Sequence, residues 1–172
     1  MNNGKAHWYE IDFPEVIELR KKFLAEQENR IFIGASALSG EWHKKITARK
    51  EVFILMGGVI YYFEEAQVRH LLRAIAQEFG QVEMAFDYSS IKGVEITNKK
   101  VLEEGGMSQV RAKWGIDDIH SIETWQPGIK VLETMTMFAE HKKKYPLWKR
   151  VGMHISDRMK IMSLARIEIV SA

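Results

Sequence analysis

The chain has 172 residues, enough for one domain spanning residues 1–172 with a sizeable hydrophobic core. Hydrophobic residues make up 46% and charged residues 28%, a composition typical of a folded globular protein. The formal net charge is only +2 and cysteine is absent, so nothing indicates nucleic acid or an anionic membrane as a partner, and disulfides, thiolate catalysis and Cys-ligated zinc are excluded.

The first half of the chain alternates predicted strands with predicted helices. The strands are rich in aromatic and β-branched residues and read HWYEID, RIFIGAS, EVFILM and QVEMAFDY. EVFILM is an almost continuous apolar run, which indicates a strand covered on both faces.

Three helices are predicted between these strands. Pro14 suits the first turn of one helix, and Ser39 is the expected cap of a short second helix. The third helix has the clearest spacing, with apolar residues at i, i+3, i+4, i+7, i+8 and i+11 from Val68 to Phe79, and Gly80 is expected to end it.

The second half of the chain gives weaker signals. TNKKVLEEGG predicts a short helix, and GIDDIHSIETW predicts a helix followed by a turn at Pro127. IKVLETMTMF and ARIEIVSA are strand candidates, joined by one or two helices around PLWKRV and SDRMKIM. We interpret the basic run HKKKY, just before PLWKRV, as a solvated surface.

The order of these elements predicts the α/β fold class. Alternation over residues 7–88 implies right-handed crossovers and a mostly parallel sheet with helices on both faces. The two late strands suggest a hairpin-like pair, so we expect an antiparallel strand near the C-terminus.

An acidic residue, Asp12, stands at the tip of the first predicted strand, and Glu10 precedes it by two positions. In open α/β sheets ligands bind beyond the carboxyl ends of the strands, where a carboxylate can accept both ribose hydroxyls of a nucleoside. Polar residues at strand ends also cap the following helix, and the two interpretations are equally open at this point. No Gly-rich phosphate-binding motif occurs in the chain.

A resemblance to a known family bears on this acid. HWYEIDFPEVIELRKKFL resembles the second-strand motif of the leucine carboxyl methyltransferase family, which has the form aromatic-Glu-Val-Asp-Leu-Pro followed by a helix. EVFILMGGVIYYFEEAQVRHLLRAI is similar to the family's fourth-strand segment, and KWGIDDIHSIETWQPGIKVLETMTMF looks like its polyketide-type branch. The resemblance implies a Rossmann-like class I methyltransferase sheet that uses S-adenosylmethionine (SAM).

The resemblance also implies roles for particular residues. Asp12 would bind the ribose hydroxyls with support from Glu10, and Ser36 and Ala37 would lie against the adenine. The remaining implied positions are Gly57 and Gly58, bordering the methionine moiety, and Tyr62, on the substrate side.

The chain departs from the family in three ways. Ser36-Ala37-Leu38 replaces an Asp-Leu-Arg found in many members, and Gly57 replaces a common Glu. Family members also place a strand and a Gly-rich loop before the acid-tipped strand. Here Met1 falls in the loop leading into that strand, so we expect the first Gly-rich strand-helix unit to be lacking and sheet edges to be left unpaired.

The predicted function is SAM-dependent transfer of a methyl group to a carboxylate or hydroxyl oxygen of a small molecule. A non-catalytic remnant or interaction module of the same fold is the alternative, and half of a dehydrogenase ranks behind both. Asp87, Tyr88 and Tyr62 lie near expected strand tips, but no catalytic base is assigned.

The remaining expectations concern metals, location and partners. We interpret the DDIH segment at residues 117–120 as a solvated helix start and expect no metal site. The chain start lacks the apolar run of a signal peptide, and no stretch reaches the roughly 20 apolar residues of a membrane span. We therefore expect a cytoplasmic protein, with no nucleic-acid or membrane partner and with possible oligomers that cover the sheet edges.

Overall fold

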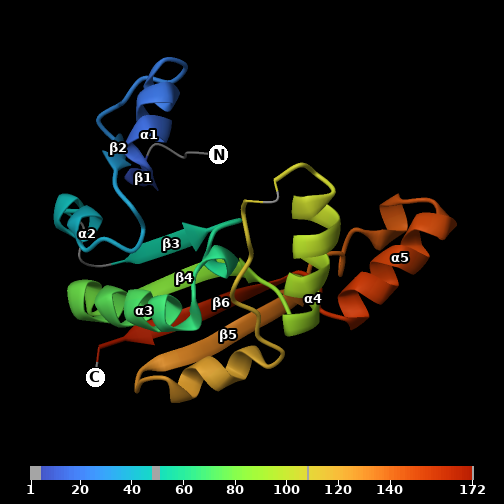
Figure 1. The fold of residues 1–172 in the computed structure, drawn as a ribbon. Helices are drawn as coiled ribbons and strands as arrows, with labels where there is room; N and C mark the ends of the chain where they lie inside the picture. The colour runs from blue at the N-terminus through green and yellow to red at the C-terminus, as the bar shows by residue number, and fades with distance from the viewer. Residues whose placement is uncertain (1–4, 48–50, 108, 172) are drawn as a thin grey trace. The chain divides into compact units, whose positions relative to one another are not determined.

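The computed structural model describes residues 5–47, 51–107 and 109–171, and the chain forms two compact units. Unit 1 comprises residues 1–49 and unit 2 residues 50–172. Each unit is presented by itself below, and Figure 1 shows the elements of both.

Unit 1 is built on two parallel strands, β1 (Trp8–Asp12) and β2 (Arg30–Gly34), in a register that sets Asp12 opposite Gly34. Helix α1 (Pro14–Lys21) joins them, and a short helix α2 (Glu41–Lys45) follows β2. The prediction that Pro14 begins α1 is confirmed. The fixed φ of proline suits this position, and the N–H groups of the first helical turn have no intrahelical acceptor, so proline loses no hydrogen bond there.

The predicted cap at Ser39 is wrong. Gly40 holds the N-cap position of α2, and no side chain caps that helix. The Ser39 hydroxyl instead donates to the Ser36 carbonyl at 2.9 Å, closing the turn that follows β2. A serine hydroxyl near a turn can either cap the following helix or hydrogen-bond to the backbone of the turn, and Ser39 does the second.

Unit 2 is built on a four-stranded sheet in the order β3-β4-β6-β5. Its strands are β3 (Val52–Met56), β4 (Gln81–Tyr88), β5 (Ile129–Thr136) and β6 (Ser163–Val170). β3 pairs with β4 in parallel, whereas β6 lies antiparallel to both β4 and β5. Three strands therefore share one direction and the last opposes them, as the sequence predicts.

Helix α3 (Glu65–Phe79) packs against β4 and β6 and supplies much of the core of unit 2 (Figure 1). A capping box between Glu64 and Gln67 begins the helix, and Gly80 follows its last residue with a positive φ of 73°. Its six periodic apolar residues are nearly inaccessible: Val68, Leu71, Leu72, Ile75, Ala76 and Phe79.

Shorter elements complete unit 2. They are the 3₁₀ turns η1 (Ile60–Tyr62), η3 (Ile119–Thr124) and η4 (Lys142–Lys144), the helices α4 (Ile91–Ile96) and α5 (Leu147–Arg158), and a π-helix η2 (Thr97–Glu103). The helix expected over 97–106 is thus a π-helix that continues from α4, which the sequence pattern does not reveal. No helix in the described ranges has both the length and the apolar character needed to cross a bilayer.

The expectation that β3 is covered on both faces is wrong. Phe53 is 55% exposed and Leu55 is 73% exposed, and both lie on the same face of the strand. Among the described residues β3 pairs only with β4, so it is an edge strand of its sheet. The described strands fall into a two-stranded sheet, β1-β2, and a four-stranded sheet, β3-β4-β6-β5.

Candidate functional site

The tips of β1 and β2 bring three predicted cofactor residues together in unit 1. Asp12 ends β1, and its backbone carbonyl accepts a hydrogen bond from the Ala35 N–H at 2.8 Å. That bond holds the Ser36–Ala37 turn directly beside the end of β1. The predicted neighbourhood of Asp12, Ser36 and Ala37 is therefore present in the structure.

The Asp12 carboxylate is exposed and only partly engaged. Its Oδ1 accepts the Phe13 N–H at 2.8 Å, which orients the side chain at the start of α1. No hydrogen bond or ion pair within the described part of the chain reaches Oδ2. Asp12 therefore orients the backbone at Phe13 through one oxygen and keeps the other as a free acceptor, the kind of group that can accept the hydroxyls of a ribose diol.

Glu10 is held by two arginines rather than by the turn. Its carboxylate lies 2.6 Å from Arg20 Nε and 3.5 Å from Arg30 Nε. These ion pairs connect β1 to α1 and to β2. Glu10 therefore helps to fix the position of the strand that ends at Asp12.

The Gly57–Gly58 turn lies at the end of β3 in unit 2. Asp87, at the end of the neighbouring β4, accepts the Gly58 N–H at 2.7 Å. Gly58 has a φ of 72°, a conformation that favours glycine, whereas a Cβ at Gly57 would meet nothing within 4 Å. The turn is thus fixed by Asp87 and presents an open backbone surface at Gly57.

Tyrosines surround this turn in different environments. Tyr61 lies with its ring centroid 4.7 Å from that of Tyr62, and its carbonyl accepts the N–H groups of Lys113 and Trp114. Burial, with the nearby charges of Tyr62 and Asp87, raises the pKa of Tyr61 to about 12. The Tyr61 hydroxyl therefore stays protonated at neutral pH.

Tyr88 is only 3% exposed, and burial raises its pKa as well. A buried phenol of this kind has no route to a substrate. The cavity that Tyr61 helps to line measures about 10 Å³, room for at most one water molecule, so it is not a substrate site either.

The predicted site residues thus form two groups. Asp12, Glu10, Ser36 and Ala37 belong to unit 1, while Gly57, Gly58 and Tyr62 belong to unit 2. Sequence reasoning missed the link from Asp87 to Gly58, and it named Tyr62 but not Tyr61, its neighbour at the same turn. The paired tyrosines of GGVIYY were the available signal, but nothing local indicates which of them faces inward.

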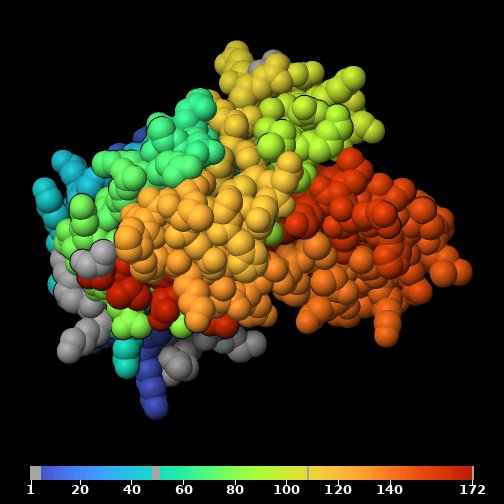
Figure 2. Space-filling view, turned by 90° about the horizontal axis from the view of Figure 1, so that it is seen from below, coloured from blue at the N-terminus to red at the C-terminus, as the bar shows by residue number. Residues whose placement is uncertain are grey.

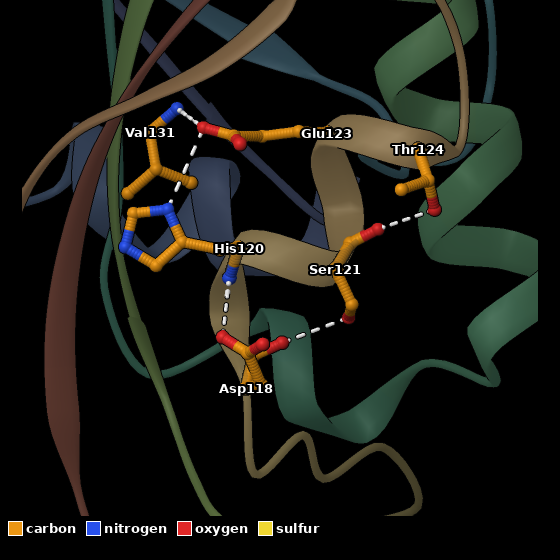
Figure 3. A network of polar contacts seen from close by, with 6 residues as sticks. All are labelled: Asp118, His120, Ser121, Glu123, Thr124 and Val131. Atoms are coloured by element: carbon orange, nitrogen blue, oxygen red, sulfur yellow. Dashed lines mark hydrogen bonds and ion pairs between the residues drawn. The ribbon is translucent and has the colours of Figure 1, made fainter.

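The DDIH segment serves structure (Figure 3). Asp118 accepts the His120 N–H at 3.0 Å and so caps η3, while its carbonyl accepts the Ser121 hydroxyl at 2.8 Å. Glu123 accepts the Val131 N–H at 2.8 Å and lies 3.6 Å from His120 Nδ1. This network fastens η3 against β5. In the described ranges no three His, Cys, Asp or Glu side chains are grouped as a metal ion would require.

No protein-family model matches the chain. Over 152 residues it is 24% identical to the tetracenomycin polyketide synthesis O-methyltransferase TcmP of Streptomyces glaucescens. That match covers 86% of this chain and 56% of TcmP, so the chain spans little more than half the length of this curated relative.

Solved structures show the same fold. A provisionally named methyltransferase of Thermobifida fusca has a TM-score of 0.65 at 13% identity, over 99% of this chain and 65% of that one. LepI, solved in complex with SAM, has a TM-score of 0.58 at 10% identity, over 98% of this chain and 37% of LepI. The chain thus has an α/β fold of the SAM-dependent methyltransferase kind.

Proposed function

We propose that the chain is part of a SAM-dependent methyltransferase that transfers a methyl group to an oxygen of a small molecule, related to the leucine carboxyl methyltransferases of the polyketide type. The observation that carries the proposal is Asp12, which offers a free carboxylate oxygen at the carboxyl tips of β1 and β2. The similarity to TcmP over 86% of the chain supports the same assignment.

In this proposal, each predicted residue has the role that the family resemblance implies for it. Asp12 accepts the ribose hydroxyls, and the turn at Ser36 and Ala37 borders the adenine. In unit 2, the open backbone at Gly57 and Gly58 borders the methionine end, and Tyr62 shapes the acceptor side. Glu10 acts through Arg20 and Arg30 by holding β1 in place.

When bound, the cofactor supplies an electrophilic methyl group. The chain holds the acceptor oxygen in line with that methyl group, at near-attack distance. Tyr61 and Tyr88 are poorly suited to act as a base, because burial raises the pKa of both phenols and keeps them protonated at neutral pH. Asp87 accepts the Gly58 N–H through one oxygen, Oδ1. No catalytic base is assigned: a carboxylate acceptor would need no proton removed, whereas a hydroxyl acceptor would be helped by a base.

The proposal includes a strand-helix unit with a Gly-rich loop that lies outside these 172 residues and completes the site. Two observations support it: in the described residues β1 pairs only with β2, and β3 only with β4. We also propose that the protein works in the cytoplasm.

Calorimetric titration with SAM tests the proposal. Asp12→Asn keeps an acceptor for the Phe13 N–H but removes the charge that holds the ribose, so we expect roughly tenfold weaker binding, equivalent to about 1.4 kcal/mol. Glu18→Gln, on the exposed face of α1, is the matched control and should leave affinity unchanged. Equal affinity of the wild-type chain and Asp12→Asn would contradict the assignment of Asp12, and no binding by any of the folded chains would contradict SAM binding by these 172 residues on their own.

A further inference from the structure

Helix α5 has its apolar side facing outward. Leu147 is 77% exposed, Trp148 73%, Val151 61% and Ile155 54%. The spacing i, i+1, i+4 and i+8 places all four side chains on one face of the helix. They form a continuous exposed strip, defined here as the α5 face.

The opposite side of α5 anchors the helix to unit 2 through a charge. Asp157 is only 8% exposed, lies 2.7 Å from Lys142 Nζ and accepts the Phe138 N–H at 3.1 Å. A helix normally buries its apolar side and exposes its polar side. Because α5 does the reverse, the α5 face is left uncovered by the rest of unit 2.

The surroundings of the α5 face are strongly basic. Residues 138–160 contain seven Lys and Arg against two Asp and Glu, a local charge of +5 in a chain whose total is +2. One of the two acids, Asp157, is already engaged by Lys142. The exposed cations near the helix are Lys143, Lys144, Lys149, Arg158 and Lys160.

We propose that α5 is a membrane-surface anchor that binds an anionic phospholipid bilayer with its axis in the interfacial plane. The α5 face would enter the boundary between headgroups and acyl chains, as short amphipathic helices with Leu and Trp on one side do. Lys143, Lys144 and Lys149 would contact anionic headgroups, and Trp148 would lie at the headgroup level. Figure 2 shows the orange and red residues of this region projecting from the rest of unit 2.

Charge distinguishes this occupant from the others. A second copy would bring the same +5 segment against itself, which is repulsive. A nucleic acid would use the cations but leave Leu147, Val151 and Ile155 in water. An anionic bilayer satisfies both features, since its apolar interior is bordered by negative headgroups.

Sedimentation of the full chain with sucrose-loaded vesicles tests this anchor. We expect binding to phosphatidylcholine vesicles containing about 30% phosphatidylserine and little binding to phosphatidylcholine alone. Raising the salt from about 0.1 M to about 0.5 M should weaken binding at least roughly tenfold, because the shorter Debye length screens the lysines.

Two pairs of variants make the test specific. Val151→Glu should reduce vesicle binding at least roughly tenfold, whereas Val101→Glu, at a 54% exposed position of η2, should not. Reversing the charges of Lys143 and Lys144 to Glu should have a similar effect, whereas the same reversal at the exposed pair Lys99 and Lys100 should have little.

Three results would overturn the anchor. One is absence of binding to anionic vesicles by a folded wild-type chain. Another is equal loss in the α5 variants and their η2 controls, which would indicate a general charge effect. The third is a concentration-dependent dimer in sedimentation that Val151→Glu abolishes, which would assign the α5 face to a second copy. SAM titration of the same samples is independent of all three.

Discussion

Helices α3 and α5 carry apolar residues at similar helical spacing but place them in opposite environments. In α3 the six periodic apolar residues are at most 5% exposed, and they pack against β4 and β6. In α5 the four residues of the α5 face are at least 54% exposed, and the buried residue is Asp157. Periodicity thus identifies an amphipathic helix, but a tertiary contact decides which side faces the protein.

The two helices should differ most in how much stability is lost when an apolar side chain is shortened to alanine. Leu72→Ala in α3 should lower the free energy of unfolding by about 3 kcal/mol, because it leaves a cavity at a site that is 1% exposed. Ile155→Ala in α5 should change it by less than about 0.5 kcal/mol. Urea denaturation measures both, and similar losses would contradict the exposure of the α5 face.

The ion pair between Asp157 and Lys142, which holds α5 to the rest of unit 2, should give the next largest effect. Asp157→Asn should destabilise the packing of α5 by about 2 kcal/mol, because it leaves Lys142 without its partner. Lys142→Met added to that variant should cost little more, since the pair is already broken. Hydrogen exchange of the α5 amides reports the local effect, and additive losses would argue against direct coupling of the two residues.

The same carboxylate predicts an acid transition. Burial alone would raise the pKa of Asp157, but the hydrogen bonds from Lys142 and Phe138 outweigh it and hold the pKa below its ordinary value. A folded-state pKa below the unfolded one adds stability that is complete above about pH 4 and is lost as the pH falls through the folded value. Circular dichroism over this range should show an α5 transition that Asp157→Asn lacks, and an unchanged transition would exclude Asp157 as its cause.

The stability contributed by N-terminal capping should differ less between the two helices. Glu64→Ala removes half of the capping box of α3 and should cost about 1 kcal/mol. α5 has no side-chain cap, and Pro146 holds its N-cap position. Thermal unfolding of Glu64→Ala checks the value, with Glu65→Ala, one residue further along, as the comparison that keeps the box intact.

The smallest expected effect is a stabilisation. Gly152 lies in the middle of α5, and a Cβ there would meet nothing within 4 Å. Gly152→Ala should therefore stabilise the helix by about 0.5–1 kcal/mol through better helix propensity. Slower hydrogen exchange in α5 would confirm this, and faster exchange would indicate close backbone packing at Gly152.

The comparison also explains how much the sequence could predict. The strands and α3 were predicted because their periodicity and their burial agree. α5 was predicted as one or two pieces, since Gly152 interrupts the pattern and the ion pair from Lys142 to Asp157 has no local signature. The face of β3 was predicted wrongly, because an apolar run cannot show whether its strand is central or at an edge.

The candidate site divides in the same way. Asp12, Ser36 and Ala37 were found because strand tips follow from the order of elements, and the structure brings them together through the bond from Ala35 to Asp12. The bond between Gly58 and Asp87 joins residues 29 positions apart, so only the pairing of β3 with β4 reveals it.

The two outer strands of the four-stranded sheet have a further consequence. At the β5 edge, Glu123 of η3 accepts the Val131 N–H (Figure 3). Among the described residues, β3 pairs with another strand on one side only. Open-ended polymerisation of a sheet requires two free edges, one to add to and one to offer. Self-association that uses the β3 edge should therefore stop at a pair of chains joined β3 to β3.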